Sequence, residues 1–476
     1  MNPLSISEIT RLAEGTLESG DDNASVERIS TDSRTIKRGE LFVALRGENF
    51  DGHKFIEDVA KADAAGAIVD EEWWNASSER VERLRRSRSS FALIGSNNTL
   101  LAYQALAANY RKSLPIKVLA ITGSNGKTST KDFAASVLGR KFRVAKTQGN
   151  FNNHVGLPRT ILDATSQDQV AVWEIGMNHP GEVAPLAKIA APDAAIITNV
   201  GVAHIEFMGS REAIAQEKGM LAEAVTPEGT VILNADDPFS EGISKRTRAR
   251  VVFAGINNGV LRATDVEQTP AGSEFTILEG AHRCRGQLSV PGLHMVQNAM
   301  LAVAAGRAFG VPLEECAIGL ATAPLTKARL QIKEVSGVQF LDDSYNANPD
   351  SMKAALRTLI ELGADGKRIA VLGEMRELGA ESQRGHEEVG QEAAALGVDQ
   401  LIGIGEMGEV IANAAKKAGL EKSGAVGSTS EAAALLSDVV EPGDLVLVKG
   451  SRAARTEEVI QHFASSHRSL VTDHSS

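Results

Sequence analysis

The segment VLAITGSNGKTSTKDF, residues 118–133, has the residue types of a phosphate-binding loop. An apolar run enters a turn rich in Gly, Ser and Asn, and a helical pattern follows the turn. Glycines let backbone N–H groups approach an anion, and the positive end of the helix dipole adds to the attraction. The strict P-loop pattern requires a Gly where this chain has Ile121. The sequence therefore predicts a shortened nucleotide loop, with a chance Gly-Lys-Thr in a turn as the alternative.

Four side chains in and around this loop could carry out phosphate chemistry. Lys127 can reach β- and γ-phosphate oxygens, and the Thr128 hydroxyl can bind Mg²⁺. Glu174 follows the apolar run VAVW, and His204 follows the run AAIITNV. Both would emerge at the carboxyl edge of one parallel sheet, which favours metal binding. The alternatives are a surface ion pair for Glu174 and a structural role for His204.

The elements that must position these residues alternate between strands and helices in three segments, which predicts an α/β protein of three domains. We expect a small α/β domain over residues 1–112. A central P-loop-type domain over 113–325 contains the runs IKVLAI, VAVWEI, AAIITNV and TVILNA, the pattern of a mostly parallel sheet covered by helices. A doubly wound, Rossmann-like domain over 326–476 follows a linker at 323–334.

Within the first segment, the run ELFVAL predicts a short strand. The stretch HKFIEDVAKADAAG predicts a helix over 53–66 that ends at Gly66. Phe55, Val59 and Ala62 have the spacing of the buried face of such a helix.

A strict Gly-x-Gly-x-x-Gly pattern occurs in the third segment, at Gly403, Gly405 and Gly408. Between a strand and a helix, this pattern is the dinucleotide-binding fingerprint. The acid about 20 residues further on, Glu421, follows a predicted helix end instead of a strand. We therefore predict a doubly wound domain without a dinucleotide.

Composition narrows the class of protein. The chain has 476 residues, of which 43% are hydrophobic, and a net charge of −11, which argues against a nucleic-acid partner. A local basic pocket can still bind an anionic small molecule. No apolar run approaches the roughly 18 residues of a membrane span, and the start MNPLSISEIT has no signal-peptide pattern. With only Cys284 and Cys316, we expect a reduced, cytoplasmic protein without membrane insertion.

Seven motifs occur together and in order: TGSNGKTST, TQGNFNNHVGLP, EIGMNHPGEV, TNVGVAHIEFMGS followed by EKG, NADDP, HMVQNAMLA and DDSYNANPDSM. This set resembles the Mur ligases of bacterial cell-wall synthesis, whose shortened loop has the form T-G-[ST]-x-G-K-[ST]. The resemblance extends from Asp32 to Arg452 and accounts for the spacing of the loop. DSYNANPDSM and LGEMRELGAES are similar to the branch that adds D-alanyl-D-alanine, and the D-N-P-R signature of the diaminopimelate-adding branch is absent.

The resemblance implies a monomeric ligase that uses ATP and Mg²⁺. It would join D-alanyl-D-alanine to UDP-MurNAc-tripeptide through an acyl phosphate, in the last cytoplasmic step of peptidoglycan precursor synthesis. The N-terminal domain would bind UDP-MurNAc, and the C-terminal domain would bind the incoming dipeptide. The third residue of the tripeptide, lysine or diaminopimelate, is not specified by the sequence.

The same resemblance implies residue roles at the ATP site. Asn298 would contact adenine, Asp343 a ribose or metal-bound water, and Arg329 the phosphates. Two Mg²⁺ ions are expected, with Thr128, Glu174, His204 and a carbamate on Lys218 as ligands, although Lys218 alone would pass as a helix-surface residue. Ala328 stands where some relatives have His, so no role for a His carries over. The loop residues implied to hold ATP are Gly123, Ser124, Asn125, Gly126, Lys127, Thr128 and Ser129, and the residues expected to carry catalysis are Lys127, Glu174, His204, Lys218 and Arg329.

Substrate contacts are implied in three places. The first is the sugar-nucleotide site, the second is the loop that would grip the acceptor, and the third is the start of the last domain. The alternatives are a cap or an ion pair for the first group and turn chemistry for the Asn cluster. The residues are, in that order, Ser33 and Arg34; Thr147, Asn150, Asn152 and Asn153; and Tyr345, Asn346 and Asn348.

Two other functions stay open. One is a different ligase of the superfamily, such as a folate polyglutamylating enzyme or another amino-acid-adding Mur ligase. The N-terminal DSR…GELFVA module argues against the folate branch, which typically begins with its ATP domain. The other is a nucleotide-binding regulator without catalysis, against which the intact set of expected catalytic residues argues.

Overall fold

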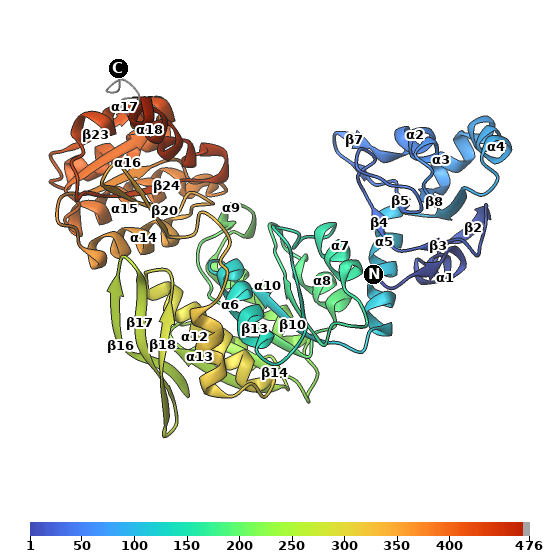
Figure 1. The fold of residues 1–476 in the computed structure, drawn as a ribbon, viewed down its shortest axis with the longest axis horizontal. Helices are drawn as coiled ribbons and strands as arrows, with labels where there is room; N and C mark the ends of the chain where they lie inside the picture. The colour runs from blue at the N-terminus through green and yellow to red at the C-terminus, as the bar shows by residue number, and fades with distance from the viewer. Residues whose placement is uncertain (470–476) are drawn as a thin grey trace, which may run out of the picture.

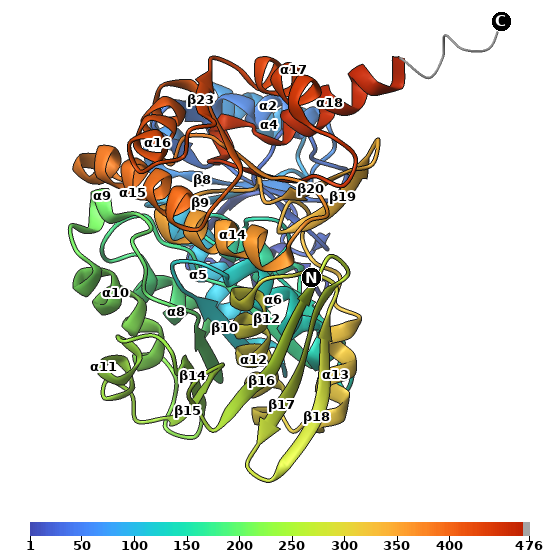
Figure 2. The same cartoon turned by 90° about the vertical axis from the view of Figure 1, so that its left-hand side faces the viewer.

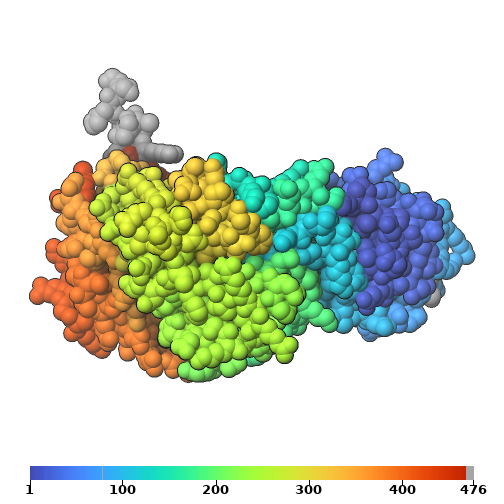
Figure 3. Space-filling model, turned by 90° about the horizontal axis from the view of Figure 1, so that it is seen from below, coloured from blue at the N-terminus to red at the C-terminus, as the bar shows by residue number. Residues whose placement is uncertain are grey.

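The computed structural model describes residues 1–469 and consists of three lobes, each built on its own β-sheet (Figure 1). The central lobe lies between the other two along the length of the molecule (Figure 3). Mixed and parallel sheets covered by helices confirm the predicted α/β class with a parallel central sheet. In the part of the chain that is described, no helix is long and apolar enough to cross a membrane.

The N-terminal lobe has a five-stranded sheet in the order β2-β9-β8-β5-β4, parallel except for β2. Two short antiparallel pairs, β1-β3 and β6-β7, complete its strands. The strands are β1 (Leu4–Ser5), β2 (Thr16–Ser19), β3 (Ser25–Val26), β4 (Ile29–Ser30), β5 (Leu41–Val43), β6 (Arg46–Gly47), β7 (Phe50–Asp51), β8 (Gly66–Asp70) and β9 (Ala92–Ser96). The helices are α1 (Ile6–Leu12), η1 (Gly52–Phe55), α2 (Ile56–Lys61), α3 (Glu71–Ala76), α4 (Ser78–Ser87) and α5 (Thr99–Ser113).

The helix expected over 53–66 covers only Ile56–Lys61, and a different set of its residues is buried. A 3₁₀ turn precedes α2, so Phe55 is 43% exposed, and Ile56, Val59 and Ala60 are the buried residues. The helix ends because Asp63 takes a left-handed backbone conformation with φ +57°. Gly66 is not the helix stop. It begins β8, where a Cβ would lie 2.4 Å from the carbonyl oxygen of Ala92.

The central lobe has a nine-stranded sheet in the order β11-β12-β10-β13-β14-β15-β16-β17-β18. The strands from β11 to β16 in this order are parallel, and the buried apolar runs predict four of them: β10, β12, β13 and β14. Strands β16 to β18 form an antiparallel arm that the sequence patterns did not indicate. The strands are β10 (Lys117–Thr122), β11 (Val144–Lys146), β12 (Val170–Glu174), β13 (Ala194–Ile197), β14 (Thr230–Asn234), β15 (Arg250–Gly255), β16 (Leu261–Thr269), β17 (Gly272–Glu279) and β18 (His282–Leu288). The helices are α6 (Lys127–Gly139), α7 (Gly156–Asp163), α8 (Val183–Ala190), α9 (Ile205–Met208), α10 (Arg211–Glu223), α11 (Ser240–Ser244), α12 (Leu293–Ala308) and α13 (Leu313–Ala321).

Helix α6, which follows the glycine-rich loop, is enclosed by its neighbours. It packs against α12 and α13, and its apolar residues belong to the core that continues along α12. Glycines make the close contact possible, since a Cβ at Gly319 of α13 would lie 2.7 Å from the Cα of Val137. Packing on several sides fixes the position of α6, and with it the position of the loop at its amino terminus.

The C-terminal lobe has a six-stranded sheet in the order β19-β20-β24-β21-β22-β23, parallel except for the β19-β20 hairpin. Figure 2 shows this lobe above the central sheet, with α14 facing the central lobe. The strands are β19 (Gln331–Val335), β20 (Val338–Asp342), β21 (Arg368–Leu372), β22 (Gln400–Ile404), β23 (Ser423–Val426) and β24 (Leu445–Lys449). The helices are α14 (Pro349–Leu362), η2 (Gly379–Glu381), α15 (Ser382–Ala395), α16 (Gly405–Lys417), α17 (Thr429–Val439), η3 (Arg452–Ala454) and α18 (Glu457–Ser469).

Helix α5 joins the first two lobes. Its apolar residues share one core with β8 and β9 on one side and with α7 and α8 on the other. The buried Tyr110 hydroxyl donates a hydrogen bond to the Ala164 carbonyl at 2.8 Å and accepts one from the Asn2 backbone N–H at 2.7 Å. The same helix thus connects the N-terminus of the chain to the central lobe.

The two buried tyrosines of α5 give a matched test of this connection. Tyr110→Phe should lower the free energy of unfolding by about 1–2 kcal/mol, because it leaves a buried carbonyl and a backbone N–H without a partner. Tyr103→Phe removes a hydroxyl that makes no hydrogen bond within residues 1–469 and should cost less than about 0.5 kcal/mol. Urea denaturation of both variants checks this, and equal losses would contradict it.

Candidate active site

The glycine-rich loop between β10 and α6 adopts a conformation that requires its glycines. Gly126, the N-cap of α6, has φ +78°, and Gly123 has φ +153°. A Cβ at Gly123 would lie 1.8 Å from the Thr198 hydroxyl, and one at Gly126 would lie 2.4 Å from the side-chain oxygen of Asn298. Only glycine fits at both positions. The same contacts place Asn298, the expected adenine contact, directly beside the loop.

The end of the neighbouring strand β13 holds the loop in place. Asn199 accepts hydrogen bonds from the backbone N–H groups of Ser124 and Asn125, both at 2.9 Å, the first through its carbonyl and the second through its side chain. The Thr198 hydroxyl donates to the Asn125 carbonyl at 2.5 Å. These bonds fix the backbone of the loop before any ligand is bound.

Lys127, Thr128 and Glu174 meet at the start of α6. The Lys127 amine lies over the loop and donates to the carbonyl of Gly123 at 2.8 Å. The Thr128 hydroxyl donates to the Glu174 carboxylate at 3.0 Å. Burial lowers the pKa of Lys127; Glu174 opposes this shift and Arg329 adds to it. Two cations and one carboxylate therefore share this small volume.

Glu174 is oriented from the side opposite Thr128. Its second carboxylate oxygen accepts a hydrogen bond from the Asn152 side chain at 2.8 Å, and its backbone N–H donates to the buried Thr147 hydroxyl at 3.0 Å. Two of the four residues expected to grip the acceptor thus contact the acid at the end of β12. A strand-end Glu paired with a surface Lys, the alternative reading, is not what the structure contains.

Arg329 reaches this cluster from the linker between the central and C-terminal lobes. Its guanidinium lies 3.3 Å from the Thr128 hydroxyl and stacks 4.2 Å from the centre of the Tyr345 ring. The residues on either side, Ala328 and Leu330, have φ values of +58° and +52°. Left-handed conformations at such residues cost about 1–3 kcal/mol each and persist where the surrounding structure imposes them.

The residues around Thr128 fit a magnesium ion that also binds nucleotide phosphates. Mg²⁺ prefers oxygen ligands and usually takes one or two from the protein and the rest from phosphates and water. Thr128 and Glu174 supply such oxygens side by side. Within residues 1–469, no group of three or more His, Cys, Asp or Glu side chains could hold a metal by itself. A site completed by phosphates is therefore the one that these residues support.

Lys218, on α10, is only 1% exposed, which an ordinary surface lysine would not be. In the described part of the chain its amine makes no hydrogen bond or ion pair. Burial lowers its pKa well below the usual range, nearby Lys127 lowers it further, and Glu217 raises it. The neutral amine is therefore favoured, and it is the neutral form of an amine that adds CO₂.

His204 stands apart from the expected metal ligands. Its ring nitrogen Nδ1 lies 2.5 Å from the Glu377 carboxylate of the C-terminal lobe. Both residues have φ +62°, and the hydrogen bond to His204 lowers the pKa of Glu377. Figure 1 shows α9, which begins just after His204, next to the C-terminal lobe. The structure thus places His204 in an interlobe contact, and metal binding by His204 stays a prediction.

The start of the C-terminal lobe faces the loop. The Asn348 side chain, which also caps α14, donates to the Asn125 side chain at 2.7 Å, and Asp350 accepts from the Val202 backbone N–H at 3.0 Å. Buried Lys449, which the sequence analysis did not single out, donates to the Asp343 carboxylate at 2.5 Å and to the Asn346 carbonyl at 2.9 Å. Its only sequence signal was its position at the end of a predicted strand.

Other predicted residues lie in local contacts. Arg34 is 85% exposed and forms an ion pair with Asp32 at 2.7 Å; the hydrogen bonds from Arg34 lower the pKa of Asp32 to about 2. Asn153 accepts hydrogen bonds from the Gly156 and Val155 backbone N–H groups at the start of α7, which is the turn chemistry considered as its alternative. For Ser33, Asn150 and Ser129 the structure gives no side-chain hydrogen bond within its described residues, and their roles stay predictions.

The glycines of the dinucleotide-like pattern serve packing. A Cβ at Gly403 would lie 2.0 Å from the Gly408 carbonyl oxygen, so the end of β22 and the start of α16 touch through their backbones. This close strand–helix contact accounts for two of the three glycines without a ligand.

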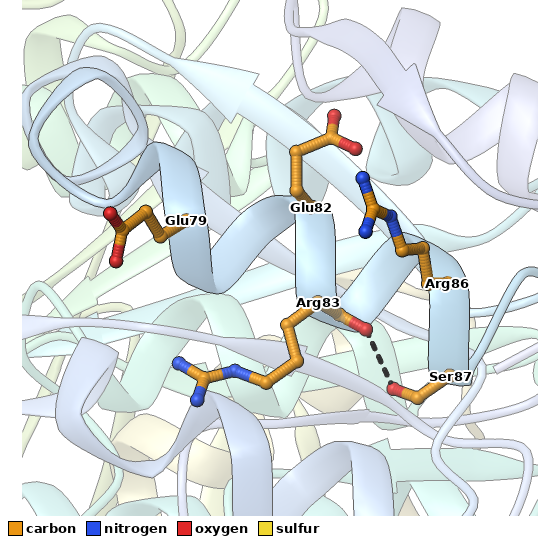
Figure 4. Close-up of a pocket in the computed structure, with 5 residues that line it drawn as sticks. All are labelled: Glu79, Glu82, Arg83, Arg86 and Ser87. Atoms are coloured by element: carbon orange, nitrogen blue, oxygen red, sulfur yellow. Dashed lines mark hydrogen bonds between the residues drawn. The ribbon is translucent and has the colours of Figure 1, made fainter.

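Two of the surface hollows within residues 1–469 lie on α4 and beside α6, outside the loop region. Figure 4 shows one of about 690 Å³ on α4, where Glu82, Arg86 and Ser87 lie along one helix and the Ser87 hydroxyl donates to the Arg83 carbonyl at 2.8 Å. It contains none of the predicted site residues. The other, of about 740 Å³, lies beside α6 and has Asp132, Lys146, Thr322 and Pro324 in its wall.

Comparisons with known proteins agree with this geometry. Three family models match the chain: "Mur ligase family, catalytic domain" over residues 25–85, "Mur ligase middle domain" over 121–306 and "Mur ligase, glutamate ligase domain" over 328–452. The UDP-N-acetylmuramoyl-tripeptide–D-alanyl-D-alanine ligase of Bacillus subtilis is 37% identical, with 97% of this chain and 98% of the relative covered.

This chain belongs to the Mur ligase family. The Escherichia coli ligase of the same name is 34% identical over 97% of this chain and 98% of its own length. Among solved structures, MurF from Acinetobacter baumannii has a TM-score of 0.88 at 32% identity, covering 98% of this chain and 99% of that one. MurF from Thermotoga maritima in complex with ADP has a TM-score of 0.81 at 27% identity, covering 93% and 98%.

The role of Lys127 can be tested on α6 itself. Lys127→Ala should lower phosphate release from ATP by roughly 10²–10³-fold, because it removes a positive charge placed where phosphate charge develops. The circular dichroism spectrum should stay unchanged. Lys141→Ala, which removes an exposed lysine just after the same helix, is the matched control and should keep full activity. Loss of secondary structure in Lys127→Ala would overturn the assignment.

Proposed function

We propose that this Mur ligase joins D-alanyl-D-alanine to UDP-MurNAc-tripeptide, with conversion of ATP to ADP and phosphate. The observation that carries the proposal is the 37% identity, over nearly the whole of both chains, to a ligase named for this reaction. The cluster of Lys127, Thr128, Glu174 and Arg329 supports it, since the reaction begins with transfer of a phosphoryl group between two anions.

The proposed chemistry has two steps. A carboxylate oxygen of the tripeptide attacks the γ-phosphorus of ATP, the bond to ADP breaks, and an acyl phosphate forms. The amine of the dipeptide then attacks the acyl carbon, loses a proton and expels phosphate. Lys127 and Arg329 reduce the repulsion between carboxylate and triphosphate in the first step. Mg²⁺, when bound, adds further neutralisation of the phosphate oxygens.

Each lobe would bind a different part of the substrates. The N-terminal lobe, with Ser33 and Arg34, would bind the sugar nucleotide, and the segment with Thr147, Asn150 and Asn152 would hold the acceptor. The C-terminal lobe would deliver the dipeptide near Tyr345, Asn346 and Asn348. Contacts such as Asn348 to Asn125 would help to exclude water from the acyl phosphate. We further propose boundaries near 112 and 325, and a cytoplasmic monomer without a nucleic-acid partner.

The substrate assignment is tested by the choice of amine. Phosphate release from ATP should be measured with UDP-MurNAc-tripeptide and, in separate reactions, D-Ala-D-Ala, meso-diaminopimelate, D-Glu or no amine. Stimulation by D-Ala-D-Ala alone is expected. Stimulation by another amine would retain ligase chemistry but move the enzyme to a different step. No stimulation by any amine would contradict the proposed function.

A carbamate on Lys218 is the proposed extra oxygen ligand for Mg²⁺. The lowered pKa of the buried amine favours its neutral form relative to that of an exposed lysine, and the neutral form is the one that adds CO₂. After incubation with ¹³C-bicarbonate, the wild-type protein should show a carbamate carbon resonance that weakens as the pH falls and the amine becomes protonated.

Lys218→Arg is the matched variant for this experiment. Arginine has a side chain of similar length, but its guanidinium does not add CO₂, so the resonance should disappear. The same resonance in Lys218→Arg, or no resonance in the wild-type protein, would overturn the carbamate proposal.

A further inference from the structure

Asp132 is a buried carboxylate on α6 that the proposed mechanism does not use. It lies in the second turn of the helix that begins at Lys127, and it is 2% exposed. One of its oxygens accepts hydrogen bonds from the backbone N–H of Thr326 at 2.9 Å and from the Thr326 hydroxyl at 2.7 Å. Thr326 belongs to the linker between the central and C-terminal lobes, 194 positions further along the chain.

The other oxygen of Asp132 faces two lysines. It accepts a hydrogen bond from Lys146 at 2.9 Å and lies 3.6 Å from the amine of Lys131, which is itself only 2% exposed. Burial alone would raise the pKa of Asp132, but Lys131, Thr326 and Lys146 together lower it. The carboxylate is therefore ionised and bonded on both oxygens, as a buried charge must be.

The contacts of Asp132 connect three parts of the candidate active site. Helix α6 carries Lys127 and Thr128 at its start. Lys146 ends β11 and is followed by Thr147, which binds the backbone of Glu174. Thr326 lies three residues before Arg329, which reaches the Thr128 hydroxyl. One carboxylate thus ties together the nucleotide loop, the strand that leads to the acceptor segment, and the linker.

The hydrogen bonds between Asp132 and Thr326 hold the linker around Arg329. Its upstream part packs against the core through Ala323 and Leu325, whereas a cavity of about 740 Å³ lies on the side of Thr322 and Pro324. Its downstream part contains the left-handed residues Ala328 and Leu330 on both sides of Arg329. Backbone strain of this kind is maintained only when both ends of the segment are fixed. The Thr326–Asp132 bonds fix one end, and β19 begins at Gln331 on the other.

We propose that Asp132 is a positioning residue that holds Thr326 so that Arg329 reaches the nucleotide loop. The inference rests on the proposed function for its kinetic consequence, since Arg329 acts on the phosphates of ATP. Asp132 itself touches no substrate. Its effect on the reaction passes through the linker and ends at the Arg329 guanidinium.

A double-mutant cycle separates positioning from stability. Thr326→Val keeps the shape of the side chain and removes the hydroxyl bond, and it should lower kcat by about tenfold, since small misplacements of catalytic groups cost rates of this order or more. In an Arg329→Ala background the same change should lower kcat by less than about twofold, because the residue that it positions is gone. Equal losses in both backgrounds would overturn the proposal.

Two further variants keep this test clear. Asp132→Asn should reproduce the coupling to Arg329, whereas Glu315→Gln should leave kcat unchanged. Glu315 is the matched control because it forms an exposed ion pair with Arg140. This pair joins α13 to the end of α6 and lies away from the linker, which Asp132 joins to the same helix. A tenfold loss in Glu315→Gln would show that any disturbance of the α6–α13 contact has this effect and would contradict a specific role for Asp132.

Hydrogen exchange supplies a readout that needs no ligase activity. Backbone amides of residues 322–330 should exchange faster in Asp132→Asn and Thr326→Val than in the unmodified protein, and Glu315→Gln should not change them. Unchanged exchange in all three variants would overturn the positioning role. If the unmodified protein released no phosphate with any amine, the proposed function would fail, while the exchange result would still decide whether Asp132 holds the linker.

Discussion

Lys127 and Arg329 come from different parts of the chain and meet at the buried start of α6, beside Glu174. Besides burial, Arg329 lowers the pKa of Lys127 and of Lys449, and Lys127 lowers the pKa of Lys218. Burial lowers the pKa of all three lysines. Asp343 pairs with Lys449, and the Lys218 amine is favoured in its neutral form, so Glu174 is left opposite both Lys127 and Arg329. One positive charge therefore remains for an anionic ligand. A nucleoside triphosphate beside a carboxylate substrate supplies the missing negative charge.

The three-lobe architecture follows from the need to assemble this charge from distant parts of the chain. The loop and Lys127 come from the central lobe, where α6 is fixed by α12 and α13. Arg329 comes from the linker, and Asp343 and Lys449 from the C-terminal lobe. Left-handed residues occur where the lobes meet, at His204, Glu377, Ala328 and Leu330. Strain at these positions persists because the contacts between the lobes hold it in place.

Features that leave a local pattern or a family motif in the sequence were predicted correctly. Buried apolar runs indicated the parallel strands β10, β12, β13 and β14, and the glycine spacing indicated the loop that Gly123 and Gly126 form. The antiparallel arm β16–β18 was not predicted, because half-exposed strands with an alternating pattern give a weak sequence signal. Helix α2 begins later than predicted, because the first residues of the expected helix form a 3₁₀ turn. The links from Asp132 to Thr326 and from His204 to Glu377 join residues far apart in the chain, and no local pattern reports such pairs. Motif position also could not distinguish Asn152, which binds Glu174, from Asn153, which caps α7.

The proposed function depends on activation of a substrate carboxylate through its phosphorylation by ATP. Isotope transfer from the tripeptide substrate to phosphate reports this step. UDP-MurNAc-tripeptide labelled with ¹⁸O in its reacting carboxylate would be converted with ATP and D-Ala-D-Ala, and the released phosphate analysed by mass spectrometry. If the reaction passes through an acyl phosphate, each released phosphate should carry one ¹⁸O atom from the carboxylate. Unlabelled phosphate, formed together with ligated product, would contradict the account.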